Sequence, residues 1–263
     1  AMNSKITDKM IEKLSSRAVL NDPINPDLYE KYDVKRGLRN ANGTGVLVGL
    51  TRIGDVVGYE IGVNGEKIPV PGRLMYRGYD VVDLVKDAES HDDYCYEQCA
   101  YLLLMGELPT KEELQNFRDF LGSVRSLPPN FTEDMIMKAP SQDIMNKLAR
   151  GVLASYSYDE NPDDLSIENV LRQSIDLIAC FPSLMAYAYQ AKRSSYDNAS
   201  LSLHYPDPEK STAENILRMI RPTGEYSDLE AKMLDRSMIL HAEHGGGCNS
   251  TFTVRMITSA GSD

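Results

Sequence analysis

Residues 240–251 read Leu-His-Ala-Glu-His-Gly-Gly-Gly-Cys-Asn-Ser-Thr. If the preceding helix continues to His244, then His241 and His244 lie on one face of it, because residues three apart on a helix are neighbours. The three glycines then end that helix, and the polar residues 249–251 can cap the next one. The stretch therefore predicts two helices joined by a glycine turn, with two histidines at the junction.

The predicted junction offers the chemistry of a ligand site. The free N–H groups and positive dipole at a helix start attract a carboxylate or phosphate, and an imidazole N–H can donate a hydrogen bond to an anionic oxygen. Two other interpretations stay open. His241, His244 and Cys248 could hold a metal, or the histidines could be structural residues beside a tight turn. The pattern slightly favours an anion-binding substrate site, since the spacing is not that of a zinc helix with histidines four apart.

From residue 80 almost to the end of the chain, apolar residues recur at helical spacing. Three positions combine a Ser or Thr with a glutamate three residues later, the capping-box pattern of a helix start: Thr110/Glu113, Ser211/Glu214 and Ser227/Glu230. Ser141 and Ser166 are further candidate N-caps, and Pro182 should kink the helix after Ser166. The helices are expected near residues 92–105, 111–124, 141–156, 166–194, 212–220, 228–244 and 250–259.

Residues 46–79 have a different pattern, with short runs of β-branched and apolar residues. Asn64-Gly65 is a hairpin-turn signal, because both residues tolerate positive φ. Pro69 and Pro71 restrict this region to edge or short strands. The sequence therefore predicts a mainly α-helical fold with a small β-hairpin or strand patch near the N-terminus. The lack of alternating strands and helices argues against a doubly wound sheet.

The composition is typical of a folded globular protein. The chain has 263 residues, of which 42% are hydrophobic and 25% are charged, and its net charge is −11. An acidic surface repels a phosphate backbone, so we expect no nucleic-acid partner, and no apolar run approaches the length of a membrane span. The four cysteines include no Cys-x-x-Cys pair. We expect them to be small buried side chains in a reducing compartment, the cytoplasm.

Several motifs in order resemble those of the citrate synthase family. They are residues 72–79 (Gly-Arg-Leu-Met-Tyr-Arg-Gly-Tyr) followed by Asp83-Leu84, residues 102–109 (Leu-Leu-Leu-Met-Gly-Glu-Leu-Pro), residues 213–217 (Ala-Glu-Asn-Ile-Leu), residues 234–241 (Leu-Asp-Arg-Ser-Met-Ile-Leu-His), and the histidine and glycine stretch. The resemblance covers residues 38–263. It implies residues 1–37 as an N-terminal helical segment and linker, and residues 38–263 as part of the family's large domain.

The resemblance implies an acyltransferase that condenses oxaloacetate with acetyl-CoA and water to give citrate and CoA. No cofactor is expected, since acetyl-CoA is a substrate, and no metal. The family works as homodimers, which implies an interface through the helices near 141–156 and 166–194. His244 matches the histidine that holds oxaloacetate, and His241, Asn249 and Ser250 match orienting neighbours.

Two departures from the family qualify these expectations. Cys248 stands where many members carry a polar amide. The segments with the enolising histidine and aspartate, the second histidine and the carboxylate-binding arginines are not found up to Asp263. They and the small domain are expected beyond it, so we expect the chain itself to be inactive. The alternatives are a 2-methylcitrate synthase, which uses propionyl-CoA, and a helical dimerisation module without catalysis.

Overall fold

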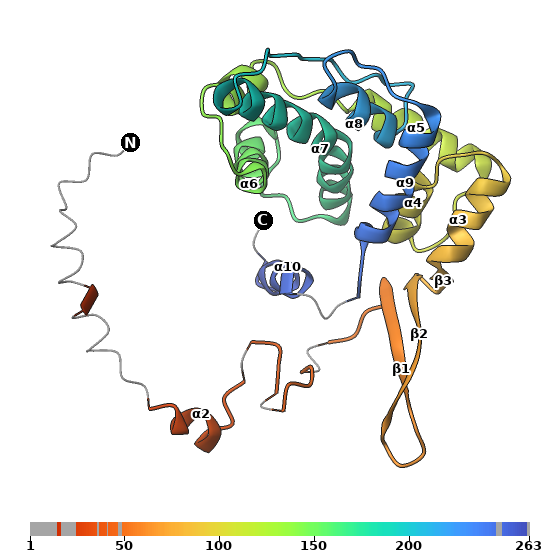
Figure 1. Cartoon of the computed structure of the whole chain (residues 1–263), viewed down its shortest axis with the longest axis vertical. Coiled ribbons are helices and arrows are strands. Elements are labelled where there is room, and N and C mark those ends of the chain that lie inside the picture. The colour runs from red at the N-terminus through yellow and green to blue at the C-terminus, as the bar shows by residue number, and fades with distance from the viewer. Residues whose placement is uncertain are drawn as a thin grey trace. The chain divides into compact units, whose positions relative to one another are not determined.

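The computed structural model describes residues 15–16, 25–35, 37–40, 42–46, 49–245 and 249–261. The chain divides into two units, Ala1–Gly49 and Leu50–Asp263, and each is described by itself. Figure 1 shows the course of the chain. None of the helices in the described ranges combines the length and the apolar character that a bilayer crossing requires.

In the first unit, the described residues include the short helix α2 (Asp27–Lys31). An isolated antiparallel bridge joins Arg39 to Gly45. Residues 1–14, at the start of the expected N-terminal helical segment, lie outside the described residues. The domain boundary after residue 37 stays a prediction.

The second unit begins with a three-stranded antiparallel sheet. Strands β1 (Gly54–Ile61), β2 (Lys67–Tyr76) and β3 (Tyr79–Asp80) lie in the order β1-β2-β3. The predicted hairpin turn between β1 and β2 is confirmed, and Gly65 adopts the positive φ of 80° that this turn requires.

Pro69 and Pro71 lie in β2, and the expectation that they allow only edge or short strands is met only in part. The prediction of short or edge strands is wrong about length, because β2 has ten residues and is the central strand. However, β3 pairs only with Met75 and Tyr76. At Pro69 and Pro71, β2 therefore has a neighbouring strand on one side only, as an edge strand does.

The rest of the second unit is mainly helical, which confirms the predicted fold class. In chain order the helices are α3 (Val81–Ser90), α4 (Tyr96–Met105), α5 (Lys111–Ser123), the π-helix η1 (Thr132–Met137), α6 (Ile144–Ser155), the 3₁₀-helix η2 (Tyr156–Tyr158), α7 (Ile167–Tyr196), α8 (Thr212–Ile220), α9 (Asp228–Ala242) and α10 (Asn249–Ser259). Both contacts of a capping box are present at α5, α8 and α9, as predicted.

Two predicted helix starts are wrong. Helix α4 begins at Tyr96 and not near residue 92, because Asp92 has a φ of +56°, which cannot continue a right-handed helix. Helix α6 is capped by Asp143, whose carboxylate accepts a hydrogen bond from the Asn146 N–H at 3.0 Å. Ser141 instead accepts a hydrogen bond from the N–H of Asp143 itself.

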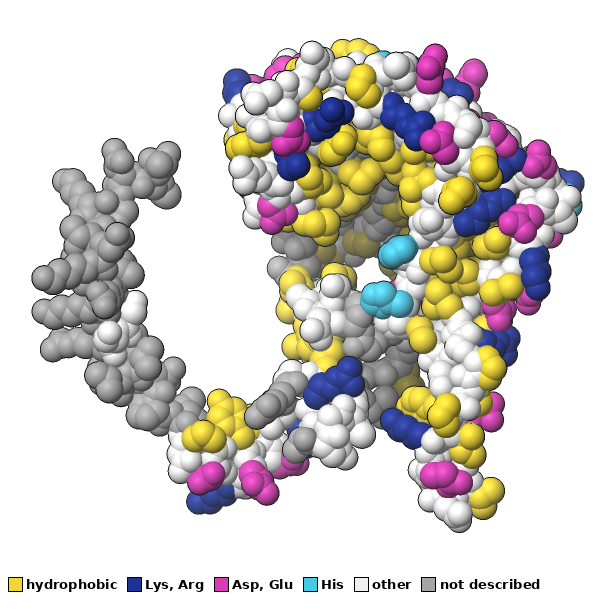
Figure 2. Space-filling model, viewed as in Figure 1, with side chains coloured by type: hydrophobic (Ala, Val, Ile, Leu, Met, Phe, Trp, Pro, Cys, Tyr) yellow, Lys and Arg dark blue, Asp and Glu magenta, His cyan; other side chains and the backbone are white. Residues whose placement is uncertain are grey.

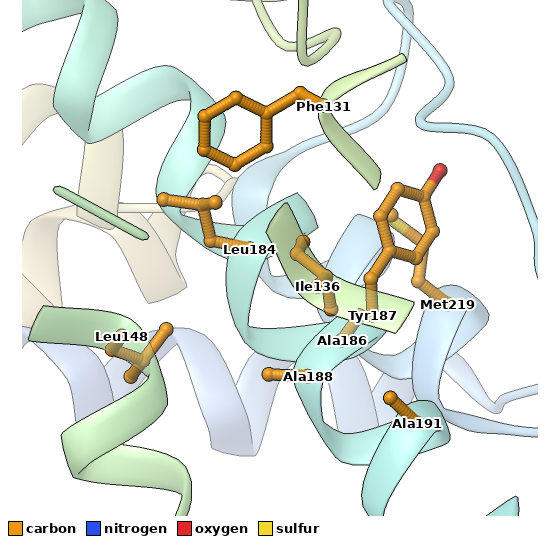
Figure 3. Packing of buried hydrophobic residues seen from close by; sticks show 9 residues of the cluster. All are labelled: Phe131, Ile136, Leu148, Leu184, Ala186, Tyr187, Ala188, Ala191 and Met219. Carbon is orange, nitrogen blue, oxygen red and sulfur yellow. The ribbon is translucent and has the colours of Figure 1, made fainter. Parts of the chain in front are cut away.

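Helix α7 lies at the centre of the helical part of the second unit, where it contacts α5, α6, α8 and η1. Its cap at Ser166 is confirmed, and Figure 1 shows the helix changing direction partway along, as expected from Pro182. Buried residues from its second half form a core cluster with Phe131 and with residues of η1, α6 and α8. The members of this cluster (Figure 3) are Phe131, Ile136, Leu148, Leu184, Ala186, Tyr187, Ala188, Ala191 and Met219.

Of the cysteines that the structure describes, two are buried as expected and the third is half-buried. Cys95 and Cys99 are fully buried, and their Sγ atoms lie 3.6 Å apart. Cys180 is half-buried, and burial raises the pKa of its thiol to about 11. Cys248 lies outside the described residues.

Candidate functional site

The junction between α9 and α10 differs from its prediction in one respect. Helix α9 ends at Ala242, and Glu243 is extended, with φ −155° and ψ 150°. His244 therefore lies beyond the helix, and the prediction that it shares a helical face with His241 is wrong. Helix α10 begins at Asn249, close to the predicted start.

The hydroxyl of Tyr76, at the end of β2, explains why α9 ends where it does. This hydroxyl donates a hydrogen bond to the carbonyl of Ile239 at 2.5 Å, the oxygen that would accept from the Glu243 N–H if the helix continued. The Glu243 N–H instead donates to the Tyr76 hydroxyl at 3.2 Å. The last turn of α9 is thus interrupted by a side chain from another element.

The base of the hairpin also limits the space around this turn. Gly54 pairs with Tyr76 across β1 and β2. A Cβ atom on Gly54 would lie 2.6 Å from Cγ of Glu243 and 3.4 Å from the backbone N of Gly245. Gly245 has a φ of +87°, which favours glycine. The segment 243–245 therefore rests closely against the start of β1.

The two histidines have different surroundings. The His241 Nδ1 lies 2.7 Å from the carbonyl oxygen of Ser237 in the same helix. The His244 backbone N–H donates to a carboxylate oxygen of Glu243 at 2.9 Å. Both side chains are exposed, and Figure 2 shows histidine side chains (cyan) open to solvent on the face displayed.

Asn249 and Ser250 are the exposed first residues of α10. Residues 246–248, which join them to the histidine segment, lie outside the described part of the chain. Within that part, no group of three or more His, Cys, Asp and Glu side chains could hold a metal ion. The proposed third metal ligand, Cys248, is among the residues left undescribed.

A buried carboxylate that sequence reasoning missed holds α9 in place. Asp235 accepts hydrogen bonds from the backbone N–H groups of Cys95 at 2.9 Å and Tyr96 at 3.0 Å, at the start of α4. Burial raises the pKa of Asp235 to about 6. The available signal was its spacing, four residues after the buried Ala231 and four before the buried Ile239.

The segment from His244 to the start of α10 carries groups of the kind that bind anions. His244 presents an exposed imidazole on a backbone segment fixed by Tyr76, and the start of α10 contributes N–H groups and a positive dipole end. An imidazole donor and a helix start are each suited to a small carboxylate.

Comparison with known proteins gives a consistent result. A family model described as "Citrate synthase, C-terminal domain" matches residues 40–263. A citrate synthase of Corynebacterium glutamicum is 35% identical over 194 residues, covering 72% of this chain and 41% of the relative. 2-Methylcitrate synthase 2 of the same organism is 30% identical over 236 residues, covering 88% of this chain and 54% of the relative. The chain thus spans about half the length of these curated relatives.

Solved structures agree. The crystal structure of citrate synthase from Pyrobaculum aerophilum superposes with a TM-score of 0.68 at 27% identity, covering 88% of this chain and 55% of that one. The crystal structure of citrate synthase from Thermotoga maritima gives a TM-score of 0.63 at 26% identity, covering 87% of this chain and 51% of that one.

Proposed function

The chain belongs to the citrate synthase family, and we propose that it supplies the oxaloacetate-holding part of an enzyme that condenses oxaloacetate with acetyl-CoA and water to give citrate and CoA. The observation that carries this proposal is the exposed His244 on a turn that Tyr76 and Gly54 fix, with α10 beginning shortly after it in the chain at Asn249. Oxaloacetate carries two carboxylates, which suit an imidazole donor and a helix N-terminus.

The roles within the site follow from position. His244 donates a hydrogen bond to oxaloacetate, while His241, Asn249 and Ser250 flank it and help to orient it. The His241 imidazole contacts its own helix at Ser237, so its contribution is to the end of α9 more than to the ligand. The enolising acid–base pair comes from other parts of the complete gene product, and the chain of residues 1–263 alone is inactive.

Helices α6 and α7 support the proposal of a homodimer. Met145 and Leu153 of α6 are each 76% exposed, although both are apolar. Helix α7 lines an apolar groove of about 370 Å³, with Leu177, Phe181 and Met185 among its lining residues. Large exposed apolar surfaces of this kind are typical of interaction sites, and a second copy is the proposed partner.

The interface is tested by sedimentation velocity on the complete gene product with Leu153→Glu. We expect this variant to shift the protein from dimer to monomer. The fully exposed Val63, in the hairpin turn, gives the matched control Val63→Glu, which should remain dimeric. A Leu153→Glu variant that stays dimeric would contradict the proposed interface.

The activity is tested by a thiol-release assay with oxaloacetate and acetyl-CoA. We expect turnover by the complete gene product and none by the chain of residues 1–263. His244→Asn in the complete protein should raise the KM for oxaloacetate. Turnover by the chain alone would refute its inactivity. A complete gene product that ends at Asp263, or that releases no thiol, would instead favour a dimerisation module without catalysis.

A second candidate function, 2-methylcitrate synthesis from propionyl-CoA, is favoured by the match to 2-methylcitrate synthase 2, which extends over 88% of this chain. One methylene in an apolar pocket changes binding by only about 1–3 kcal/mol. The ratio of kcat/KM for acetyl-CoA and propionyl-CoA in the complete gene product decides between the two thioesters.

A further inference from the structure

We propose that Tyr76 is a positioning residue for His244. Tyr76 and Gly54, at the base of the β1–β2 hairpin, together fix the backbone of residues 243–245 and thereby set the affinity for oxaloacetate. This inference rests on the proposed function, because His244 must be the residue that holds the substrate.

The Tyr76 hydroxyl is placed to fix the backbone on which His244 stands. Tyr76 is fully buried, and its hydroxyl bonds to Ile239 and to Glu243, residues 163 and 167 positions away in the chain. The hydroxyl also lies 3.0 Å from the carbonyl oxygen of Glu243. The backbone of Glu243 is thus held by one side chain from the sheet.

Gly54 provides a second, independent constraint on the same segment. It lies directly across from Tyr76 in the β1–β2 ladder, and the absence of a side chain there leaves room for Glu243 and Gly245. Tyr76 holds the turn by hydrogen bonds, while Gly54 permits its close approach. Two residues of one cross-strand pair therefore act on one turn.

The orientation of His244 depends on this turn. Among the described residues, the only hydrogen bond of His244 is from its backbone N–H to Glu243, and the imidazole is exposed. The direction in which the imidazole leaves the chain is therefore set by the backbone of residues 243–245. A shift of that backbone moves the donor away from the oxygen it must meet, which weakens binding of the substrate.

The first test uses steady-state kinetics of the complete gene product. Tyr76→Phe removes only the hydroxyl, and we expect the KM for oxaloacetate to rise about tenfold, the effect of one lost hydrogen bond, while the KM for the thioester stays within about twofold. Tyr187→Phe is the matched control, because Tyr187 is also buried and its hydroxyl bonds to a single carbonyl, that of His204. This control should leave the KM for oxaloacetate unchanged.

A second pair of variants leaves Tyr76 intact. Gly54→Ala should raise the KM for oxaloacetate in the same selective way, because the new methyl group meets Glu243. Gly72→Ala, in the neighbouring strand β2, is its control, since a Cβ atom there meets nothing within 4 Å. An equal rise in both KM values, or a rise with Tyr187→Phe or Gly72→Ala as large as with their counterparts, would overturn the proposal.

Amide hydrogen exchange on the chain of residues 1–263 separates failure of this inference from failure of the proposed function. In Tyr76→Phe we expect exchange at Glu243 and His244 to accelerate at least about tenfold, with Cys95 and Tyr96 still protected. Unchanged exchange at Glu243 would refute the positioning role of Tyr76 whatever the enzyme does. If exchange is accelerated in Tyr76→Phe but the complete gene product shows no turnover, the positioning role of Tyr76 stands and the proposed substrate is refuted.

Discussion

A rise in pH from about 4 to about 7.5 should destabilise the folded chain through the buried carboxylate of Asp235. Burial raises the pKa of Asp235 from its ordinary value of 3.8 to about 6. Because the folded protein then binds the proton more tightly, the stabilising contribution is complete below about pH 4 and is lost as the pH rises through 6. One pKa unit corresponds to about 1.36 kcal/mol, so ionisation of Asp235 costs the folded state about 3 kcal/mol.

The assay compares urea unfolding of the unmodified chain and of Asp235→Asn across this pH range, followed by circular dichroism. The asparagine cannot ionise, so the difference between the two free energies of unfolding isolates the titration of Asp235. This difference should shift by about 3 kcal/mol in favour of the variant as the pH rises. The matched control is Asp83→Asn, at an exposed position in α3. A difference that is independent of pH, or that shifts in favour of the unmodified chain, would refute the reasoning.

Three further predictions follow from packing and charge. Leu184→Ala, in the core cluster of Figure 3, should lower the free energy of unfolding by about 2–5 kcal/mol in urea titrations. Gly122→Ala should lower it by about 1–3 kcal/mol, because the new methyl group overlaps the carbonyl oxygen of Pro208; a melting temperature equal to that of Gly72→Ala would contradict this. The Arg172 guanidinium lowers the pKa of Asp159 to about 2, so Asp159→Asn should cost about 1 kcal/mol at neutral pH. That cost should vanish as the pH falls through about 2.

Local rules predicted the three capping-box helix starts well and the end of α9 poorly. The capping boxes at Thr110, Ser211 and Ser227 each depend on residues three positions apart, so the sequence contains all the information they need. The end of α9 depends instead on the hydroxyl of Tyr76, which comes from a strand 167 residues before Glu243. No pattern within the helix itself contains that contact.

The sequence predicted the junction that carries the candidate site, but it did not predict the residues that hold this junction in place. The histidine and glycine stretch identified the junction between α9 and α10, because histidines, glycines and capping residues have strong local preferences. Tyr76 was noticed only as part of a motif, since a buried hydroxyl and a buried apolar ring give the same hydrophobic pattern. Asp235 was missed because a carboxylate on an apolar helix face is satisfied only by a partner from another helix.

At the starts of two helices, backbone N–H groups donate hydrogen bonds to carboxylates of helices that are distant in the sequence. This has a consequence for folding kinetics. The N-terminus of α4 is held by Asp235, 140 residues later, and the N–H of Thr212 at the start of α8 donates to Glu97 of α4, 115 residues earlier, at 2.7 Å. Neither contact can form until remote segments of the chain have met, and such long loops close slowly. Helices α4, α8 and α9 should therefore consolidate together in a late, cooperative step. The polypeptide that emerges first during synthesis must wait for α9 before α4 is complete.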